Sequence, residues 1–417
     1  MKKGIRFYLA LYGAKLFSRG LSLIGRAGTH NPGVLALKIC PDFLARMDMP
    51  KTIIGITGTN GKTTTANMVI DILTDNGFQP VSNRSGSNIL GGVVTTLIGA
   101  INLKGQTVRD LAVLELDERS SRLIYPYVHP NLLLVTNLFR DSFKRNAHAE
   151  FIYDILDQNI PASTKLVLNG DDLISARLAA KNDRVYFGVD PLENEEIMDN
   201  NIIQDLPLCP YCGAPMVYEF RRYHHIGRAH CEKCGLVSET PDVLGRHCDF
   251  ASPALDYALC AVHPETGRVE MRMHEQTENF KMVGQSAPDL YNLAGAIALL
   301  SEFGLTPLQL RSSIEKLHIV ESRYHEEEIA GKTVILSVAK GQNPIACSRV
   351  FDSIRRRPGR KTVILMLDDL GDAKETSENI SWLYDTDYEF LRDDSIVQII
   401  CAGVRSLDHR VRLLVAG

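Results

Sequence analysis

The chain has 417 residues, of which 45% are hydrophobic and 23% charged, and its formal net charge at pH 7 is −4. This composition is typical of a globular protein with two or three domains and a large core. Because proteins that bind nucleic acid generally carry a basic surface, the weakly acidic balance argues against that class. The sequence has no signal peptide and no apolar run long enough to span a bilayer, which predicts a cytoplasmic protein.

The first segment, residues 1–48, is predicted to be helical. On its first helix a face of apolar side chains recurs every three or four residues: Phe7, Ala10, Leu11, Ala14, Phe17 and Leu21. Basic side chains flank this face: Lys2, Lys3, Arg6, Lys15, Arg19 and Arg26. Two interpretations stay open. The helix packs on its own domain with the basic residues in water, or it makes a peripheral contact with the inner face of an anionic membrane.

The strongest motif lies between a β-rich run at residues 51–57 and a helical stretch at 66–74. It is Gly55-Ile56-Thr57-Gly58-Thr59-Asn60-Gly61-Lys62-Thr63-Thr64. It is a variant phosphate-binding loop, because strict spacing would require glycine at position 56. Gly58 and Gly61 let backbone N–H groups approach phosphate oxygens, Lys62 supplies positive charge, and Thr63 offers a hydroxyl to Mg²⁺. We predict an ATP site over Gly58, Thr59, Asn60, Gly61, Lys62, Thr63 and Thr64. A glycine-rich turn without a ligand is the alternative.

Short apolar runs at residues 111–116, 132–136 and 165–168 predict an α/β fold with a mostly parallel sheet. Ligands of such sheets bind at the carboxyl ends of the strands. Glu115 ends the first run, and a carboxylate there is costly to bury unless it meets a cation, so we predict it as the second Mg²⁺ ligand. The alternative for this acidic segment is a turn exposed to solvent, which suits Asp117 and Glu118 better than Glu115. Asn137 and Asn169 follow strands and are predicted to contact the nucleotide, but an Asx-turn explains each equally well.

An inserted module is expected at residues 205–249, which are rich in Cys, His and Tyr. Two CxxC pairs lie in it: Cys209 with Cys212, and Cys231 with Cys234. Four thiolates close a tetrahedron, so this spacing predicts a structural Zn²⁺ ribbon. The alternative, two redox-active pairs, lacks the βαβ context that it requires.

A second, smaller α/β domain is predicted for residues 321–417, with strands at 333–338 and 362–367. Arg323, Lys340 and Asn343 are candidates for contact with substrate or nucleotide when the domains close, and a surface salt bridge is the alternative for each. The chain ends at Gly417 soon after a predicted strand, which leaves open whether a terminal segment is missing.

These motifs resemble those of a known superfamily. The loop at residues 58–65, Asn137, the turn at 169–172 and the pair Tyr291-Asn292 are similar to the Mur ligases and folylpolyglutamate synthetases. Within that superfamily, the Cys₄ module, residues 26–33 and the block at 381–385 resemble the MurT family over nearly the whole chain. The resemblance implies a central ATPase domain at residues 49–320 that carries the ribbon. It also implies a carboxyl-terminal domain that docks GatD, a glutamine amidotransferase subunit.

The resemblance further implies the reaction. ATP converts the α-carboxyl of D-glutamate in the lipid II stem peptide to an acyl phosphate, and ammonia from the glutaminase subunit makes the amide during peptidoglycan synthesis. Lys62 and Glu115 would be catalytic. In the family an aspartate before the Ser-Trp block completes the partner's triad. Here Asn379 takes that place, with Glu375 and Glu378 as alternatives.

One departure concerns a histidine that Mur ligases commonly have after the aspartate in the segment following Thr136-Asn137, because Arg140-Asp141-Ser142 lacks it. Two rival hypotheses stay open. The first is a free-standing ligase that joins an amino acid to a carboxylate. The second is a zinc-ribbon protein that binds partners under nucleotide control and catalyses nothing.

Overall fold

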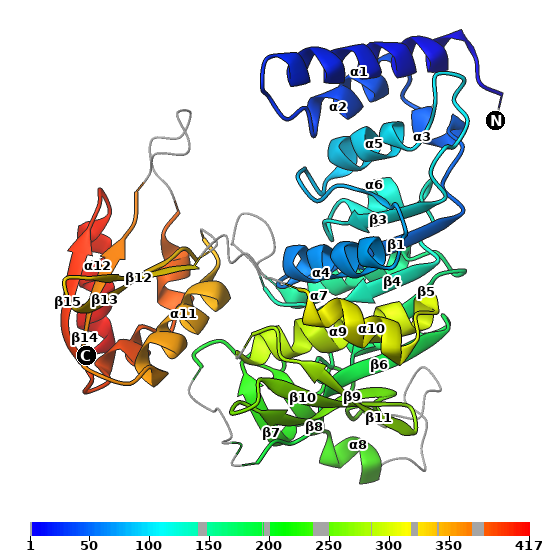
Figure 1. The fold of residues 1–417 in the computed structure, drawn as a ribbon. Helices are drawn as coiled ribbons and strands as arrows, with labels where there is room; N and C mark the ends of the chain where they lie inside the picture. The colour runs from blue at the N-terminus through cyan, green and yellow to red at the C-terminus, as the bar shows by residue number, and fades with distance from the viewer. Residues whose placement is uncertain are drawn as a thin grey trace.

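A large mixed sheet organises the central part of the computed structural model (Figure 1). The structure describes residues 2–140, 148–193, 195, 201–236, 250–284, 286–317, 324–339, 342–368 and 379–417. The sheet has nine strands in the order β11-β10-β9-β6-β5-β4-β1-β3-β2, and only the pairs of β9, β10 and β11 are antiparallel. The bounds are β1 Thr52–Thr57, β2 Val81–Ser82, β3 Leu111–Glu115, β4 Leu132–Val135, β5 Lys165–Asn169, β6 Arg184–Val189, β9 Tyr257–His263, β10 Arg268–Met273 and β11 Gln276–Lys281.

Both faces of the sheet are covered, as the continuous apolar runs require. Successive strand residues point to opposite sides, so Ile53 joins one hydrophobic cluster and Ile54 the other. One face is covered by α4 (Lys62–Asp75), α9 (Ala287–Phe303) and α10 (Pro307–Glu315). The opposite face is covered by α5 (Leu90–Gly99), α6 (Ser121–Ile124) and α7 (Ala149–Asn159), and η1 (Ser175–Arg177) follows β5. The predicted α/β architecture with a mostly parallel sheet is confirmed.

The amino-terminal helices pack on the second of these faces. They are α1 (Ile5–Leu23), α2 (Asn31–Ile39) and α3 (Phe43–Arg46), and α1 contacts α2 and α5. The predicted apolar face of α1 buries Phe7, Ala10, Leu11 and Ala14 in the shared core. This part of the helix is therefore packed on its own protein. Within the described ranges, no helix combines the length and apolar character needed to cross a bilayer.

The cysteine-rich insertion forms an antiparallel hairpin of β7 (Val217–Tyr223) and β8 (Ile226–His230), followed by α8 (Glu232–Leu236). Residues 237–249 of the predicted module lie outside the described residues. The tip of the hairpin is buried against the central sheet, because Tyr223 and Ile226 belong to its core.

The carboxyl-terminal region has a core of its own around Phe351, Trp382 and Tyr388. Its elements are the antiparallel pair β12 (Tyr324–Ile329) and β13 (Lys332–Ser337), α11 (Pro344–Arg356), the parallel pair β14 (Lys361–Met366) and β15 (Ile396–Ala402), η2 (Ser381–Asp385), η3 (Tyr388–Arg392) and α12 (Ser406–Ala416). The fully buried carboxylate of Asp387 joins it to the central region. This carboxylate accepts hydrogen bonds from Asn201 Nδ2 at 2.8 Å and from the N–H of Ile202 at 2.6 Å.

Candidate nucleotide site and zinc centre

The glycine-rich loop connects the end of β1 to the first turn of α4 at the edge of the sheet. Gly58 has φ +124° and Gly61 has φ +85°, conformations that favour glycine. A Cβ on Gly58 would collide with Thr136, and a Cβ on Gly61 would collide with the amide of Asn292 on α9. Both glycines are therefore required by backbone conformation and by close neighbours at the same time.

The loop is held in place by the segment that follows β4. Asn137 Oδ1 accepts a hydrogen bond from the N–H of Asn60 at 3.0 Å, and Asn137 Nδ2 donates to the carbonyl of Asn60 at 3.1 Å. Thr136 Oγ1 donates to the same carbonyl at 2.7 Å. The Asn137 side chain is thus engaged with the backbone of the loop itself.

Asn169 lies one strand further and is fully buried. Its Nδ2 donates to the carbonyl of Thr136 at 3.0 Å, and its Oδ1 accepts from the N–H of Asp171 at 3.1 Å. These contacts fit the Asx-turn interpretation. Asn169 therefore holds Thr136 in place, and Thr136 in turn binds the loop at Asn60.

Lys62 forms a buried ion pair with Glu118, with 2.6 Å between Nζ and Oε1. The same Nζ donates to the carbonyls of Gly58 and Thr59. Burial alone would lower the pKa of Lys62. The Glu118 carboxylate, with smaller contributions from Glu115 and Asp117, instead raises it above its ordinary value. Lys62 is therefore a charged ammonium folded over its own loop.

The expectation that Glu118 belongs to a solvated acidic turn is wrong, because Glu118 is only 4% exposed. Its burial follows from the sheet: β1 and β3 are parallel neighbours with Ile56 opposite Glu115, so the residues after β3 reach the loop after β1. The sequence shows neither this adjacency nor the register.

Glu115 and Thr63, the two predicted Mg²⁺ ligands, lie on neighbouring elements of this edge. Glu115 is half-buried, and its Oε1 accepts a hydrogen bond from Asn88 Nδ2 at 2.8 Å. Thr63 is exposed, and its hydroxyl has no hydrogen bond to the described part of the chain. A free hydroxyl and a carboxylate are oxygen donors of the kind that Mg²⁺ prefers.

The four cysteines converge as predicted. Their sulfur atoms lie within 4.8 Å of one another, with 3.6 Å between Cys209 and Cys234 and 3.4 Å between Cys212 and Cys231. Zn–S bonds of about 2.3 Å in a tetrahedron require sulfur separations of about 3.7 Å. None of the four forms a disulfide. The cluster is compatible with structural Zn²⁺, and it leaves no position for a reactant.

The hairpin that begins at this cluster ends beside the nucleotide loop. At its tip, His225 Nε2 lies 3.1 Å from Asp172 Oδ1, and both side chains are fully buried. Asp172 Oδ2 accepts from the N–H of Leu138, the residue after Asn137, at 2.7 Å. Near the end of β7, the Arg222 guanidinium lies 3.4 Å from the carboxylate of Asp171. Neither His225 nor Arg222 was predicted as a site residue, because nothing in the sequence near them indicates contact with residues 171 and 172.

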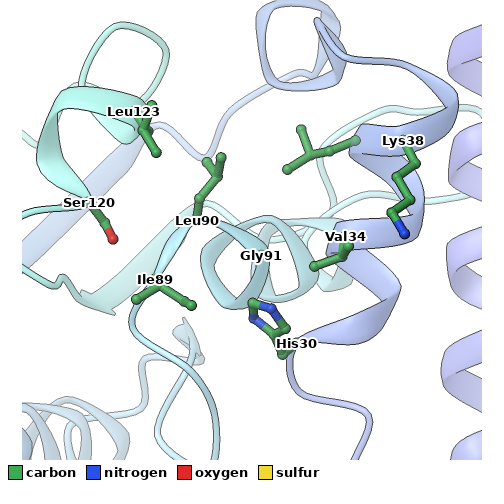
Figure 2. Close-up of a pocket in the computed structure, with 9 residues that line it drawn as sticks. His30, Val34, Lys38, Ile89, Leu90, Gly91, Ser120 and Leu123 are labelled. Atoms are coloured by element: carbon green, nitrogen blue, oxygen red, sulfur yellow. The ribbon is translucent and has the colours of Figure 1, made fainter. Parts of the chain in front are cut away.

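A pocket of 430 Å³ opens between α2, the start of α5 and α6 (Figure 2). Its lining is mainly apolar, with His30 and Lys38 on one side and Ser120 on the other. His30 Nδ1 is buried and has no hydrogen-bond partner in the described part of the chain. Ser120 comes two residues after Glu118, the partner of Lys62.

The remaining predicted residues are dispersed. Asn343 is fully buried and caps α11, with its Oδ1 accepting from the N–H of Ala346 at 2.8 Å. Asn379 is exposed, and its Oδ1 accepts from the N–H of Ser381 at 2.9 Å. Arg323, Lys340, Glu375 and Glu378 lie outside the described residues.

A glycine-rich phosphate loop with a buried lysine, set at the strand ends of a mostly parallel sheet, defines the nucleotide-binding class to which the Mur ligases belong. The fold agrees with two solved structures. A pseudomurein peptide ligase type C from Methanothermus fervidus superposes with a TM-score of 0.61 and 20% identity over 88% of this chain and 70% of that one. MurF from Acinetobacter baumannii gives a TM-score of 0.56 and 14% identity over 88% and 66%.

Relatives in sequence show to which family within this class the chain belongs. The MurT subunit of lipid II isoglutaminyl synthase from Streptococcus pneumoniae is 30% identical over 95% of this chain and 84% of that protein. The Staphylococcus aureus subunit of the same name is 27% identical over 99% and 88%. Residues 341–417 match the family model described as MurT ligase C-terminal. The chain belongs to the MurT family and is a ligase, as its motifs predicted.

Proposed function

We propose that this chain is the ATP-dependent subunit that amidates the α-carboxyl of D-glutamate in the lipid II stem peptide, giving D-isoglutamine for peptidoglycan synthesis. Its ammonia would come from a GatD-type glutamine amidotransferase subunit. The observation that carries the proposal is the buried, charged Lys62 on a braced glycine-rich loop. The relatives supply the substrate, because they are named lipid II isoglutaminyl synthase subunits and glutamine-hydrolyzing.

The first step creates a leaving group. A carboxylate does not react with ammonia at neutral pH, so its oxygen attacks the terminal phosphoryl group of ATP, giving an acyl phosphate and ADP. Lys62 would exchange the carbonyls of Gly58 and Thr59 for phosphate oxygens and offset the charge of the transferring group. Mg²⁺, held by Thr63 and Glu115, would neutralise further phosphate charge.

The second step forms the amide. Ammonia attacks the acyl carbon, phosphate leaves with the electron pair of the broken C–O bond, and a proton is lost from nitrogen. Water competes for the same carbon, so the site must exclude it. The apolar pocket lined by Val34, Ile89 and Leu123 also includes Ser120, two residues from the Glu118 that pairs with Lys62. We assign to it the part of the substrate next to the reacting carboxyl.

The proposed ammonia supply requires a docking surface for the second subunit. The carboxyl-terminal region carries many exposed apolar side chains, which is unusual for a surface that faces water alone. They lie on β14, β15 and α12: Ile364, Met366, Val397, Ile400, Leu407, Val411, Leu414 and Val415. In this proposal residues 49–320 form the ATPase domain, residues 321–417 dock the amidotransferase, and exposed Asn379 serves its triad.

The Lys62→Ala variant tests the nucleotide role. We expect ATP hydrolysis and amidation of lipid II to fall at least about 100-fold, because preorganised charge at a phosphoryl site commonly contributes this much. Lys51→Ala is the matched control, since Lys51 immediately precedes β1, the strand that leads into the loop, and its side chain is 80% exposed. Unchanged turnover in Lys62→Ala would refute the proposal.

A second experiment distinguishes amidation from amino-acid addition. The chain, with and without a co-expressed glutaminase subunit, is supplied with lipid II, ATP and either glutamine, ammonium or single amino acids. We expect the amide product from glutamine only in the complex, and from ammonium in both samples. A product carrying an added amino acid would favour the free-standing ligase instead.

A further inference from the structure

Helix α1 has a second apolar face, which points away from the protein. The buried face is formed by Phe7, Ala10, Leu11 and Ala14. On the opposite side, Ile5, Leu9, Tyr12, Leu16 and Leu23 are exposed by 81%, 57%, 48%, 74% and 88%. Their spacings of four, three, four and seven residues place them in one line along the helix. We call these five residues the outer stripe.

The charged residues of α1 and of the segment before it are all basic. No aspartate or glutamate occurs in the chain before Asp42. Lys2, Arg6, Arg19 and Arg26 are exposed, and none of them forms an ion pair with a residue in the described part of the chain. Two neighbouring lysines differ, because Lys3 pairs with Asp48 and Lys15 donates to the backbone carbonyls of Ile98 and Ile101.

We propose that the outer stripe of α1 binds the surface of an anionic lipid bilayer, with the helix lying in the interfacial region. An interfacial helix needs apolar side chains on one side, basic side chains flanking them and no acidic groups, and α1 presents this combination. The exposed leucines would enter the acyl boundary while Arg6 and Arg19 meet anionic headgroups. A protein partner would need matching acidic groups on both flanks of a narrow apolar ridge, which is a more restrictive requirement.

The position of α1 suits this role. It forms one end of the molecule, away from the carboxyl-terminal region (Figure 1). A bilayer at that end would leave exposed the surface assigned to the second subunit. It would also lie close to the pocket, because α2 packs against α1 and contributes His30, Val34 and Lys38 from its own turns and its amino-terminal cap. This last point rests on the proposed function, under which the substrate carries a lipid anchor.

Vesicle flotation of the full chain tests the proposal without substrate or partner. The probes are vesicles of phosphatidylcholine alone and of phosphatidylcholine mixed with phosphatidylglycerol. We expect the chain to float with the mixed vesicles, and more weakly when the salt concentration is raised. Leu9→Gln/Leu16→Gln should reduce partitioning more than about ten-fold, because each leucine loses its apolar burial. Arg6→Gln/Arg19→Gln should reduce binding to the mixed vesicles.

The matched control is Leu308→Gln/Leu336→Gln. These leucines, on α10 and β13, are 72% and 61% exposed, and this variant should float like the natural chain. All changed side chains are exposed, so circular dichroism should be unchanged. Three results would overturn the proposal: no flotation with mixed vesicles, equal loss in the control, or self-association that Leu9→Gln/Leu16→Gln abolishes without any lipid binding. Because no turnover is measured, failure here would leave the proposed ligase function untouched.

Discussion

The ion pair between Lys62 and Glu118 makes a quantitative prediction about the nucleotide-free protein. Their side chains are 11% and 6% exposed, and 2.6 Å separates the charged atoms. Removing one partner leaves the other as a buried charge without compensation, which costs about 3 kcal/mol or more. Lys62→Met and Glu118→Gln should therefore each lower the free energy of unfolding by about 3 kcal/mol. The double variant leaves neither charge, so it should be more stable than the sum of the two losses implies.

We expect a coupling energy of at least about 2 kcal/mol from this double-mutant cycle. Urea denaturation without nucleotide, followed by far-ultraviolet circular dichroism, measures it. Tryptophan fluorescence is the wrong signal, because the single tryptophan, Trp382, lies in the carboxyl-terminal core.

A second cycle on Lys51 and Asp110 provides the control. These residues immediately precede β1 and β3, their charged atoms lie 3.3 Å apart, and their side chains are 80% and 71% exposed. Exposed pairs contribute little, so the coupling should stay below about 1 kcal/mol. If the losses from Lys62→Met and Glu118→Gln simply add, within about 0.5 kcal/mol, the buried pair does not exist in solution and the reasoning fails.

Two further predictions concern the cysteine-rich hairpin. Burial of His224 lowers its pKa from 6.5 to about 4. In the pH range between these two pKa values, the unfolded chain therefore binds a proton at this histidine that the folded protein does not. The free energy of unfolding should therefore fall by up to about 3 kcal/mol as the pH drops from 6.5 to 4. In His224→Asn, which tolerates the positive φ of 50°, the pH dependence should be flatter; an unchanged slope would contradict the assignment. Removing Zn²⁺ with a chelator, or Cys234→Ser, should destabilise the protein by at least about 3 kcal/mol and weaken nucleotide binding in titration calorimetry, whereas Cys260→Ser, at a half-buried cysteine of β9, should do neither.

Local patterns were sufficient for the loop and for the cysteine ligands, because glycine conformation and CxxC spacing are set by a few adjacent residues. The role of Glu118 was missed, because it depends on which strand lies beside β1 and in what register. For helix α1, the sequence predicted only one of the two apolar faces. Its period identified the face that buries Phe7 and Leu11, but the separate line through Leu9 and Leu16 becomes visible only once the packed side is known.

The proposed Zn²⁺ at the cysteine cluster would have a physical role in this ligase. A two-stranded hairpin is marginally stable alone, so Cys209 and its three partners would fix one end with metal while the other end is held by the sheet. At that second end, His225 meets Asp172, and Asp172 binds the backbone N–H next to Asn137. The Asn137 side chain in turn forms two hydrogen bonds with the backbone of Asn60 in the loop. The hydrogen bonds of Asp172 are buried and those of Asn137 are partly buried, so a hairpin loosened by metal loss would leave the Asp172 carboxylate partly unsatisfied and weaken the support of the loop.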